Sequence, residues 1–366
     1  SIYQVHGDLI KAKESLKKSI EINGTEIRAL FLFSILNSSS DVENIHNLII
    51  SCDADSLASK TDQIDILFAK SNVFHTIKNF SEAGSYLRKA NEIKSALFPS
   101  DYEIYFRKTD SMMQIDKKIS PNKINQEKNG NQINHIFIVG MPRCGSTLLE
   151  SILCTNPSVV GLGEVFNVNN FYMHKKDYAE TDFKEFIKGN SNYIYVDKQL
   201  YNFSYCGFII NQIPNSKIIH LIRNPLDNLL SIYRTHFASG NAYSTKISEC
   251  LKMYLLHLEA TSYYKIKYPN NILTINYEDL VSAPEKTIKG LIKSLSLKWN
   301  KSYLEHDKFK RDIQTASKVQ ARNKINDKSL NSWENYPSIF NEQFFNSEIY
   351  KKIKSNLGND ISQIEL

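Results

Sequence analysis

The chain has 366 residues, of which 42% are hydrophobic and 23% charged, so it can fill a core and does not have the composition of a disordered protein. This length predicts two domains, or one domain with a helical extension. The net charge of +6 is too small to indicate a nucleic-acid binder. It suits a pocket for an anionic small molecule, although a lysine-rich surface explains it equally well. No run of about 18 uncharged apolar residues is present, so we expect no membrane span.

The start of the chain does not resemble a signal peptide, because Asp8 interrupts it and no apolar stretch follows. A chain that begins at Ser1 could still have lost a leader. The five cysteines are odd in number and show no CxxC spacing. This pattern argues against a disulfide framework and against a zinc site, and it favours a reducing, cytoplasmic location.

Residues 1–118 predict a helical region with repeats. Leu9 is followed by Ala12 and Leu16, and the same spacing recurs 71 positions later, where Phe80 begins the pattern. That distance is close to two periods of about 34 residues, which resembles tetratricopeptide repeats. A degenerate copy would lie at residues 25–52, and the first copy would be incomplete at its N-terminal side. The alternative is an ordinary amphipathic helical bundle.

Residues 119–134 are rich in Asn, Lys and Gln and predict a linker. From residue 135 to the end, short apolar runs alternate with helical patterns. The runs at 135–140, 193–196, 217–222 and 271–277 predict strands, and helices are expected from about 146 and over 225–237, 246–267 and 279–296. This alternation predicts an α/β domain over 135–366, with a P-loop-like parallel sheet flanked by helices.

The segment from Ile138 to Leu149 reads I-V-G-M-P-R-C-G-S-T-L-L, which predicts a strand, a glycine-bearing loop and a helix start. Such a loop curls around an oxyanion, and the N–H groups of residues 144–147 would point at it from the helix N-terminus. The loop resembles GxxxxGKS/T, but Ser146 stands where the triphosphate-binding lysine belongs. The missing lysine, with Arg143 inside the loop, argues against a nucleoside triphosphatase.

A second candidate anion-binding site, called a station below, consists of Arg223 at the end of the strand 217–222 and Ser231 eight positions later. Ligands bind at the carboxyl ends of strands in open α/β sheets. A strand-end arginine and a serine two turns into the next helix can hold a second phosphate. The spacing is weak evidence alone and becomes strong beside the first loop.

Together, G-M-P-R-C-G-S-T, R-N-P-L-D-N-L-L-S and the later Y-E-D-L at Tyr277 resemble the sulfotransferases that use 3′-phosphoadenosine 5′-phosphosulfate (PAPS). Within that family the tyrosylprotein sulfotransferase-like branch is most similar, and its bacterial members often carry tetratricopeptide repeats. The resemblance implies PAPS as co-substrate, no metal, and Arg223 and Ser231 as ligands of the 3′-phosphate. It implies that the first loop holds the 5′-phosphosulfate through Arg143, Cys144, Gly145, Ser146, Thr147 and Leu148. Cys144 replaces a serine often found there, and a backbone N–H survives that change.

The resemblance also suggests catalytic residues. Glu164, in a G-E turn, would take the acceptor proton, and burial would raise its pKa toward general-base use. Without the resemblance, an exposed loop carboxylate is the better interpretation. Lys198 would reach the bridging oxygen of the donor, or else be a surface lysine at a strand end. Arg143 would face the sulfuryl group, and Ser317 belongs to a segment that closes over the nucleotide.

Further nucleotide contacts are expected from Tyr277, which could equally be core, and from Lys328. The acceptor would carry a hydroxyl, on a protein tyrosine or a glycan, and the repeats would bind a protein or peptide partner. Two alternatives stay open. One is a repeat-containing binding scaffold whose nucleotide-binding domain is inactive, and the other is a divergent P-loop phosphoryl-transfer enzyme.

Overall fold

A computed structural model describes residues 8–36, 43–120, 133–177, 183, 189–190, 192–213, 215–309 and 322–360. The N-terminal part is all helical, as predicted. Its helices are α2 (Leu9–Ile22), α3 (Ile27–Ile35), α4 (Glu43–Ser51), α5 (Lys60–Thr76), α6 (Phe80–Leu97) and α7 (Tyr102–Lys117).

The two helices that carry the repeated pattern begin in the same way. The side chain of Asp8 accepts a hydrogen bond from an N–H in the first turn of α2, and Asn79 does the same for α6. The alanines and leucines of the pattern are buried in both helices, namely Ala12, Leu16, Ala83 and Leu87. Both helices are therefore confirmed, whereas their assignment to tetratricopeptide repeats stays a prediction.

The second part is built on a parallel sheet. Among the described residues its strand order is β2 (Val159–Gly163), β3 (Ile194–Asp197), β1 (His135–Gly140), β4 (Ser216–Ile222) and β5 (Ile272–Asn276), and every neighbouring pair is parallel. The four predicted strands are confirmed. The sequence analysis missed β2, because V-V-G-L-G is short and contains two glycines that weaken a strand.

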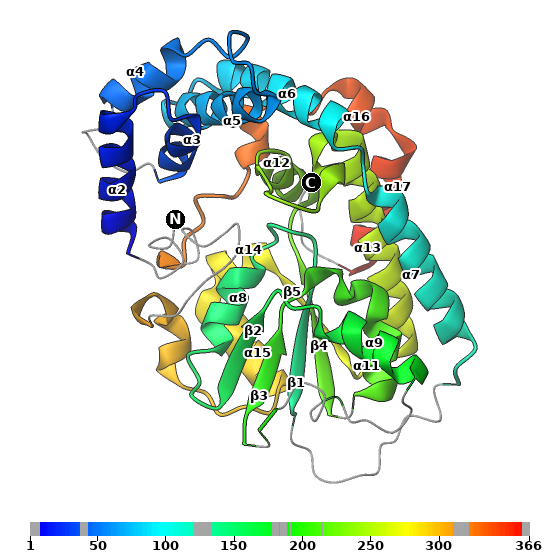
Figure 1. The fold of residues 1–366 in the computed structure, drawn as a ribbon. Coiled ribbons are helices and arrows are strands. Elements are labelled where there is room, and N and C mark those ends of the chain that lie inside the picture. Colours follow the sequence, from blue (N-terminus) through cyan, green and yellow to red (C-terminus); the bar gives the residue numbers. More distant parts are fainter. Residues whose placement is uncertain are drawn as a thin grey trace.

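Helices cover both faces of this sheet (Figure 1). On one face, Ile136 and Ile138 of β1 pack with α8 (Ser146–Leu153) and α15 (Pro284–Ser294). On the other, Phe137 and Val139 join a core with α11 (Cys206–Gln212), α12 (Pro225–Tyr233) and α13 (Ile247–Lys267). The remaining helices are α9 (Asn167–Asp177), α14 (Tyr277–Ser282), α16 (Glu342–Asn346) and α17 (Glu348–Asp360), and the short 3-10 turns are η3 (Leu200–Tyr205), η4 (Ala242–Thr245), η5 (Lys301–Leu304), η6 (His306–Lys308) and η8 (Ser332–Asn335).

The helix predicted over 279–296 is wrong in one respect, because the chain forms two helices there. α14 ends at Ser282, and Pro284 begins α15. Proline lacks the N–H that a continuous helix would need at this position, so it serves as the first residue of a new helix.

The N-terminal helices arch over the carboxyl ends of the strands (Figure 1). They are not separate from the sheet domain in packing terms, because Phe33 of α3 and Phe68 of α5 belong to the same buried cluster as Phe137 of β1. Polar bonds reinforce the contact: Asp116 at the end of α7 accepts from Tyr268 (2.8 Å) and from Lys267 (2.8 Å). The N-terminal helices therefore cover the edge of the sheet formed by the carboxyl ends of the strands, where ligands bind in open α/β folds.

Candidate active site

The loop after β1 contains backbone conformations with positive φ, which glycine adopts without strain. Gly140 has φ 153°, and a Cβ there would lie 2.5 Å from the Leu221 carbonyl oxygen. Gly145 has φ 99°, and a Cβ there would overlap the ring of Tyr277. Arg143, between them, also adopts a positive φ of 67°. A non-glycine residue held in this region stores strain that the surrounding structure must offset, which is a feature of functional loops.

Helix α8 begins directly after this loop, with Gly145 as its N-cap and with Ser146 and Thr147 buried in its first turn. First-turn amides lack partners within the helix and attract anions. The expectation for Cys144 needs a correction, because its N–H donates to the Met141 carbonyl (3.3 Å). Burial also raises the pKa of the Cys144 thiol to about 11, so its sulfur is neutral.

The two predicted phosphate-binding sites, the loop around Arg143 and the pair Arg223 and Ser231, are in direct contact. The Nε atom of Arg143 donates to the hydroxyl of Ser231 on α12 (3.2 Å). Burial, and then the neighbouring guanidinium groups of Arg223 and Arg234, lower the pKa of Arg143 to about 10. The side chain therefore stays cationic at neutral pH, in a cluster of positive charge that favours a strongly anionic ligand.

Arg223 follows β4 and holds this cluster together. Its guanidinium donates to the carbonyls of Arg143 (3.1 Å) and Ser329 (2.8 Å) and lies 4.8 Å from the centre of the Tyr277 ring. Its buried Nε has no hydrogen-bond partner among the described residues. A buried cationic donor without a partner is costly, and a phosphate oxygen would satisfy it.

A late segment of the chain lies against this station. Asp227 accepts hydrogen bonds from the backbone N–H groups of Asn331 (2.7 Å) and Trp333 (3.0 Å). Just before them, the Ser329 and Tyr277 hydroxyls bond each other (2.9 Å). Lys328 is exposed and lines the same cleft. Ser317 lies outside the described residues.

Glu164 and Lys198 form an ion pair at the ends of β2 and β3, with 2.7 Å between Oε1 and Nζ. Lys198 is fully buried, so the interpretation as a surface lysine is wrong. The expectation of a buried Glu164 is also wrong, because 44% of its side chain is exposed. The exposed carboxylate lines the cleft, while its lysine partner supports it from behind.

Two buried carboxyl groups behind this pair were not found from the sequence. Glu150 of α8 accepts the N–H of Gly163 (3.0 Å), and the N–H of Lys198 bonds the Gly163 carbonyl (2.9 Å), so both fix the Glu164 turn. Asp197 accepts from the N–H of Gln199 (2.8 Å). Burial raises the pKa of Asp197 to about 7. The available signal for Glu150 was an acid inside an apolar helical pattern, and for Asp197 an acid directly after the apolar run predicted as a strand at 193–196.

One cleft of about 1000 Å³ unites most of the predicted residues. Those that line it are Arg143, Gly145, Ser146, Thr147, Leu148, Glu164, Arg223, Ser231, Tyr277 and Lys328. Cys144 and Lys198 are buried just behind its wall. The opposite wall comes from α3 and α5, which the sequence analysis did not place at the site. Such a volume is at the upper end of the range for small-molecule sites, so it leaves room for a donor and an acceptor.

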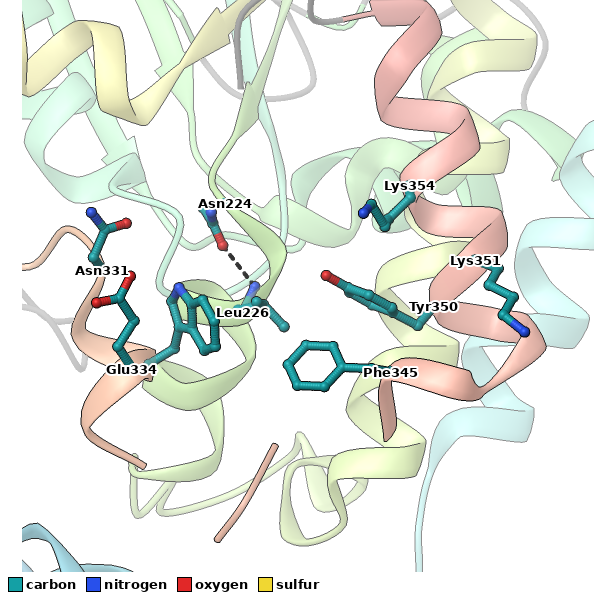
Figure 2. A pocket seen from close by; sticks show the side chains of 9 residues that line it. Asn224, Leu226, Asn331, Glu334, Phe345, Tyr350, Lys351 and Lys354 are labelled. Carbon is teal, nitrogen blue, oxygen red and sulfur yellow. Dashed lines mark hydrogen bonds between the residues drawn. The ribbon is translucent and has the colours of Figure 1, made fainter. Parts of the chain in front are cut away.

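A smaller pocket of about 540 Å³ lies between α12 and the C-terminal helices and contains none of the predicted site residues. Figure 2 shows Phe345, Tyr350, Lys351 and Lys354 around it, with Asn224 capping α12 through the N–H of Leu226 (2.9 Å). Residues of both predicted anion stations therefore line the larger cleft.

None of the helices in the described part of the chain combines the length and apolar character needed to cross a bilayer. Within the same residues, no three His, Cys, Asp or Glu side chains are grouped to hold a metal ion.

Residues 135–188 and 181–301 match the model of the sulfotransferase family. This region holds β1 to β5, both anion stations and the Glu164–Lys198 pair. Over these residues the chain is similar to the sulfotransferase family.

Individual relatives are distant. An uncharacterized protein of Aquifex aeolicus (strain VF5) is 26% identical over 90% of this chain, and the chain spans 47% of that protein's length. A putative protein-tyrosine sulfotransferase of Caenorhabditis briggsae is 22% identical over 54% of this chain and 80% of its own length. Among solved structures, the sulfotransferase domain of the Synechococcus PCC 7002 olefin synthase has a TM-score of 0.48 and 15% identity, over 65% of this chain and 98% of that domain.

Proposed function

We propose that this protein transfers a sulfuryl group from PAPS to a hydroxyl acceptor. The observation that carries the proposal is the junction of the two anion stations, where Arg143 bonds Ser231 and Arg223 bonds the carbonyl of Arg143. A donor with a 5′-phosphosulfate and a 3′-phosphate requires two such stations in one cleft. A nucleoside triphosphate would instead require the loop lysine that Ser146 replaces.

The residues of the chain divide the work as follows. The first-turn amides of α8, with Arg143, would hold the 5′-phosphosulfate, and Arg223 with Ser231 would hold the 3′-phosphate. PAPS supplies the sulfuryl group. Tyr277, which packs against both Arg223 and Gly145, would limit the movement of the bound nucleotide.

In the transfer step, the acceptor oxygen bonds to sulfur while its proton passes to the Glu164 carboxylate. The bond between sulfur and the bridging oxygen breaks, and its electron pair stays on the 5′-phosphate. Lys198 and Arg143 would offset the charge that grows on that oxygen and on the sulfuryl oxygens. Lys198 is fully buried and Arg143 is half-buried, which strengthens this effect because charges interact more strongly away from water.

The acceptor is a hydroxyl on a protein tyrosine or on a glycan. Similarity to the Caenorhabditis briggsae protein supports the tyrosine alternative. Peptide binding by the N-terminal helices and a cytoplasmic location belong to the same proposal, and all five cysteines are free thiols, as a reducing compartment would require. Ser317 keeps its proposed role in closing over the nucleotide.

A labelled-donor assay tests the proposal with a panel of tyrosine peptides and glycans. Glu164→Ala and Lys198→Ala should each lower kcat by about 100-fold or more, with the donor still bound. Glu285→Ala is the matched control, because it breaks a surface ion pair of the same 2.7 Å length. Unchanged sulfation in both site variants would refute the chemistry. Turnover of ATP without turnover of PAPS would favour a phosphoryl-transfer enzyme, and donor binding without any transfer would favour an inactive scaffold.

A further inference from the structure

The cleft has a wall that lies outside the region matching the sulfotransferase model. Residues 28–35 of α3 and 72–76 of α5 line it opposite the donor stations. On α3, Arg28, Leu32 and Ile35 are spaced by four and three residues and therefore share one face of the helix. Ile35 is 42% exposed although it lies in a helix whose other large apolar residues are mostly buried. Two apolar side chains, Leu32 and Ile35, thus face the cleft beside Arg28, opposite the proposed donor stations.

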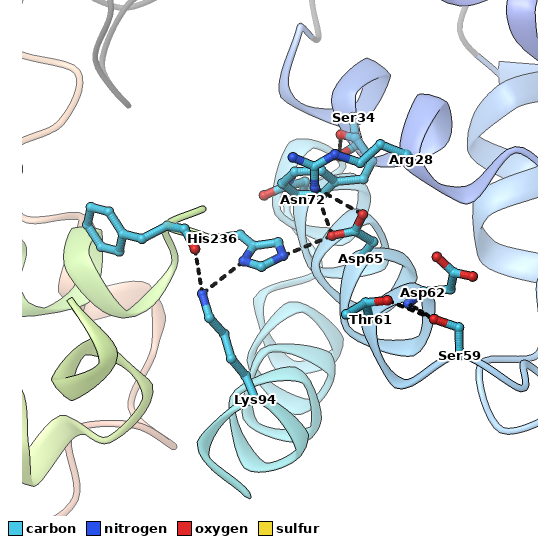
Figure 3. Close-up of polar contacts among 11 residues, drawn as sticks. Arg28, Ser34, Ser59, Thr61, Asp62, Asp65, Asn72, Lys94 and His236 are labelled. Atoms are coloured by element: carbon cyan, nitrogen blue, oxygen red, sulfur yellow. Dashed lines mark hydrogen bonds and ion pairs between the residues drawn. The ribbon is translucent and has the colours of Figure 1, made fainter. Parts of the chain in front are cut away.

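A polar network links this wall to His236, in the segment that follows α12 (Figure 3). Asp65 of α5 accepts from Arg28 with both oxygens (3.0 Å each) and bonds Nε2 of His236 (2.9 Å). His236 also stacks on Phe68, with 4.6 Å between ring centres, and bonds Lys94 (2.9 Å). Because His236 follows Ser231 of α12 by five residues, the network ties the acceptor side of the cleft to the 3′-phosphate station.

The charges of this wall are largely cancelled. Arg28 is paired with Asp65, and burial lowers the pKa of His236 below its usual value, so its ring is neutral. Burial, helped by Arg234, lowers the pKa of His75 to about 3, and both of its ring nitrogens are bonded, to Tyr336 (2.8 Å) and to Arg234 (3.2 Å). The wall therefore offers neither a free base nor an uncompensated cation. Its polar side chains bond within the helices, because Asn72 donates to the Ser34 hydroxyl (3.0 Å) and the Thr76 hydroxyl donates to the Asn72 carbonyl (2.9 Å). Beside them lies the apolar surface of Leu32 and Ile35.

We infer that α3 and α5 form the acceptor subsite, with Leu32 and Ile35 contacting an apolar or aromatic group that carries the reactive hydroxyl. This inference rests on the proposed function and adds the acceptor class. Contact between an apolar surface and a ring or alkyl group lowers the free energy of binding because both release water. Contact with a sugar lowers it little, because the sugar hydroxyl groups would lose water without finding hydrogen-bond partners.

The test measures acceptor KM in the full-length chain with labelled PAPS. The probes are 4-nitrophenol and a methyl glycoside. Wild type should use the phenol with a kcat/KM at least about tenfold above that for the glycoside. Ile35→Ser and Leu32→Ser should raise the KM for the phenol about tenfold. The dissociation constant for adenosine 3′,5′-bisphosphate should stay within about twofold, because these residues do not belong to the donor stations.

Ile115→Ser is the matched control, since Ile115 is an isoleucine with the same 42% exposure, on α7 and outside the cleft lining. Ile35→Trp is a second variant that keeps the helix apolar but fills the cleft, and it should exclude bulky phenols. An unchanged phenol KM in both serine variants, or a wild-type preference for the glycoside, would overturn the inference while leaving the transferase proposal intact. Absence of transfer to every acceptor by the wild-type chain would overturn both.

Discussion

Asp197 lies directly before Lys198, and the pKa of its carboxyl predicts how the free energy of unfolding depends on pH. In the folded protein burial raises the pKa of this carboxyl from 3.8 to about 7. In the unfolded chain the group loses its proton near pH 4. Between these two values the folded state holds a proton that the unfolded state has released, so the free energy of unfolding falls as pH rises. Below pH 4 and above pH 7 the group contributes no slope.

The size of the effect follows from the two pKa values. One pH unit within this window is equivalent to about 1.4 kcal/mol, so the three units between them amount to roughly 4 kcal/mol. Asp197→Asn keeps an acceptor for the Gln199 N–H and removes the titration. Relative to wild type, the variant should therefore gain roughly 4 kcal/mol of stability between about pH 4 and pH 7.

Urea unfolding of both proteins at half-unit pH steps measures this difference directly. Taking the difference between variant and wild type cancels the titration of every other group that the substitution leaves alone. Asp55→Asn is the control, because Asp55 is exposed and the same substitution there removes no buried carboxyl. A flat difference for Asp197→Asn would show that the buried carboxyl does not hold its proton, and the reasoning would be refuted.

Three further predictions concern the cleft. Glu150→Gln retains an oxygen for the Gly163 N–H, so kcat should fall less than about tenfold. Glu150→Ala removes that oxygen and should lower kcat more and shift the pH profile of kcat. Equal effects of the two substitutions would contradict a role of Glu150 in positioning Glu164. Arg223→Ala should weaken binding of adenosine 3′,5′-bisphosphate about 10- to 100-fold in calorimetry, while Ser231→Ala costs less than about tenfold; unaltered affinity in both would remove the second station. Cys144→Ser should keep donor affinity within about twofold, because the thiol is buried and neutral, and a larger loss would show that the sulfur contributes.

The fold was largely predictable because its signals are local. β1 and β4 are rich in isoleucine and other apolar residues, and both are followed by loops whose glycine, proline or arginine marks the end of the strand. β2 escaped because two glycines and exposed positions hide the apolar pattern in a strand at the sheet edge. The division between α14 and α15 follows from the missing N–H of Pro284. The helical periodicity of the surrounding residues suggested one continuous helix and so concealed this division.

The site was predictable only where one motif holds several of its members. The loop at 143–147 was indicated by its own motif, and the pair Arg223 and Ser231, which lies within nine residues, became a strong signal beside that loop. Glu150 acts through the Glu164 turn, which folds next to it from a separate element. Asp197 adjoins Lys198 in the chain, but its burial depends on the pairing of β3 with β1 and β2, which the local sequence does not show. Nothing in the local sequence around Arg28 or Ile35 indicates a catalytic cleft, because their placement depends on how the helical region packs against the sheet.

That packing explains how the donor and acceptor sides of the cleft would act together. Helix α8 carries the anion loop at its N-terminus and, through Glu150, the turn of Glu164, so binding at the loop and the position of the proposed base share one rigid element. Helix α12 carries Ser231, and the residues after it carry His236, which bonds to Asp65 of α5. A shift of α5 would therefore reach the proposed 3′-phosphate site at Arg223 and Ser231. Asp65→Asn, which removes the charge that pairs with Arg28, should accordingly change acceptor KM and donor affinity together, whereas the substitutions at Leu32 and Ile35 should change acceptor KM alone.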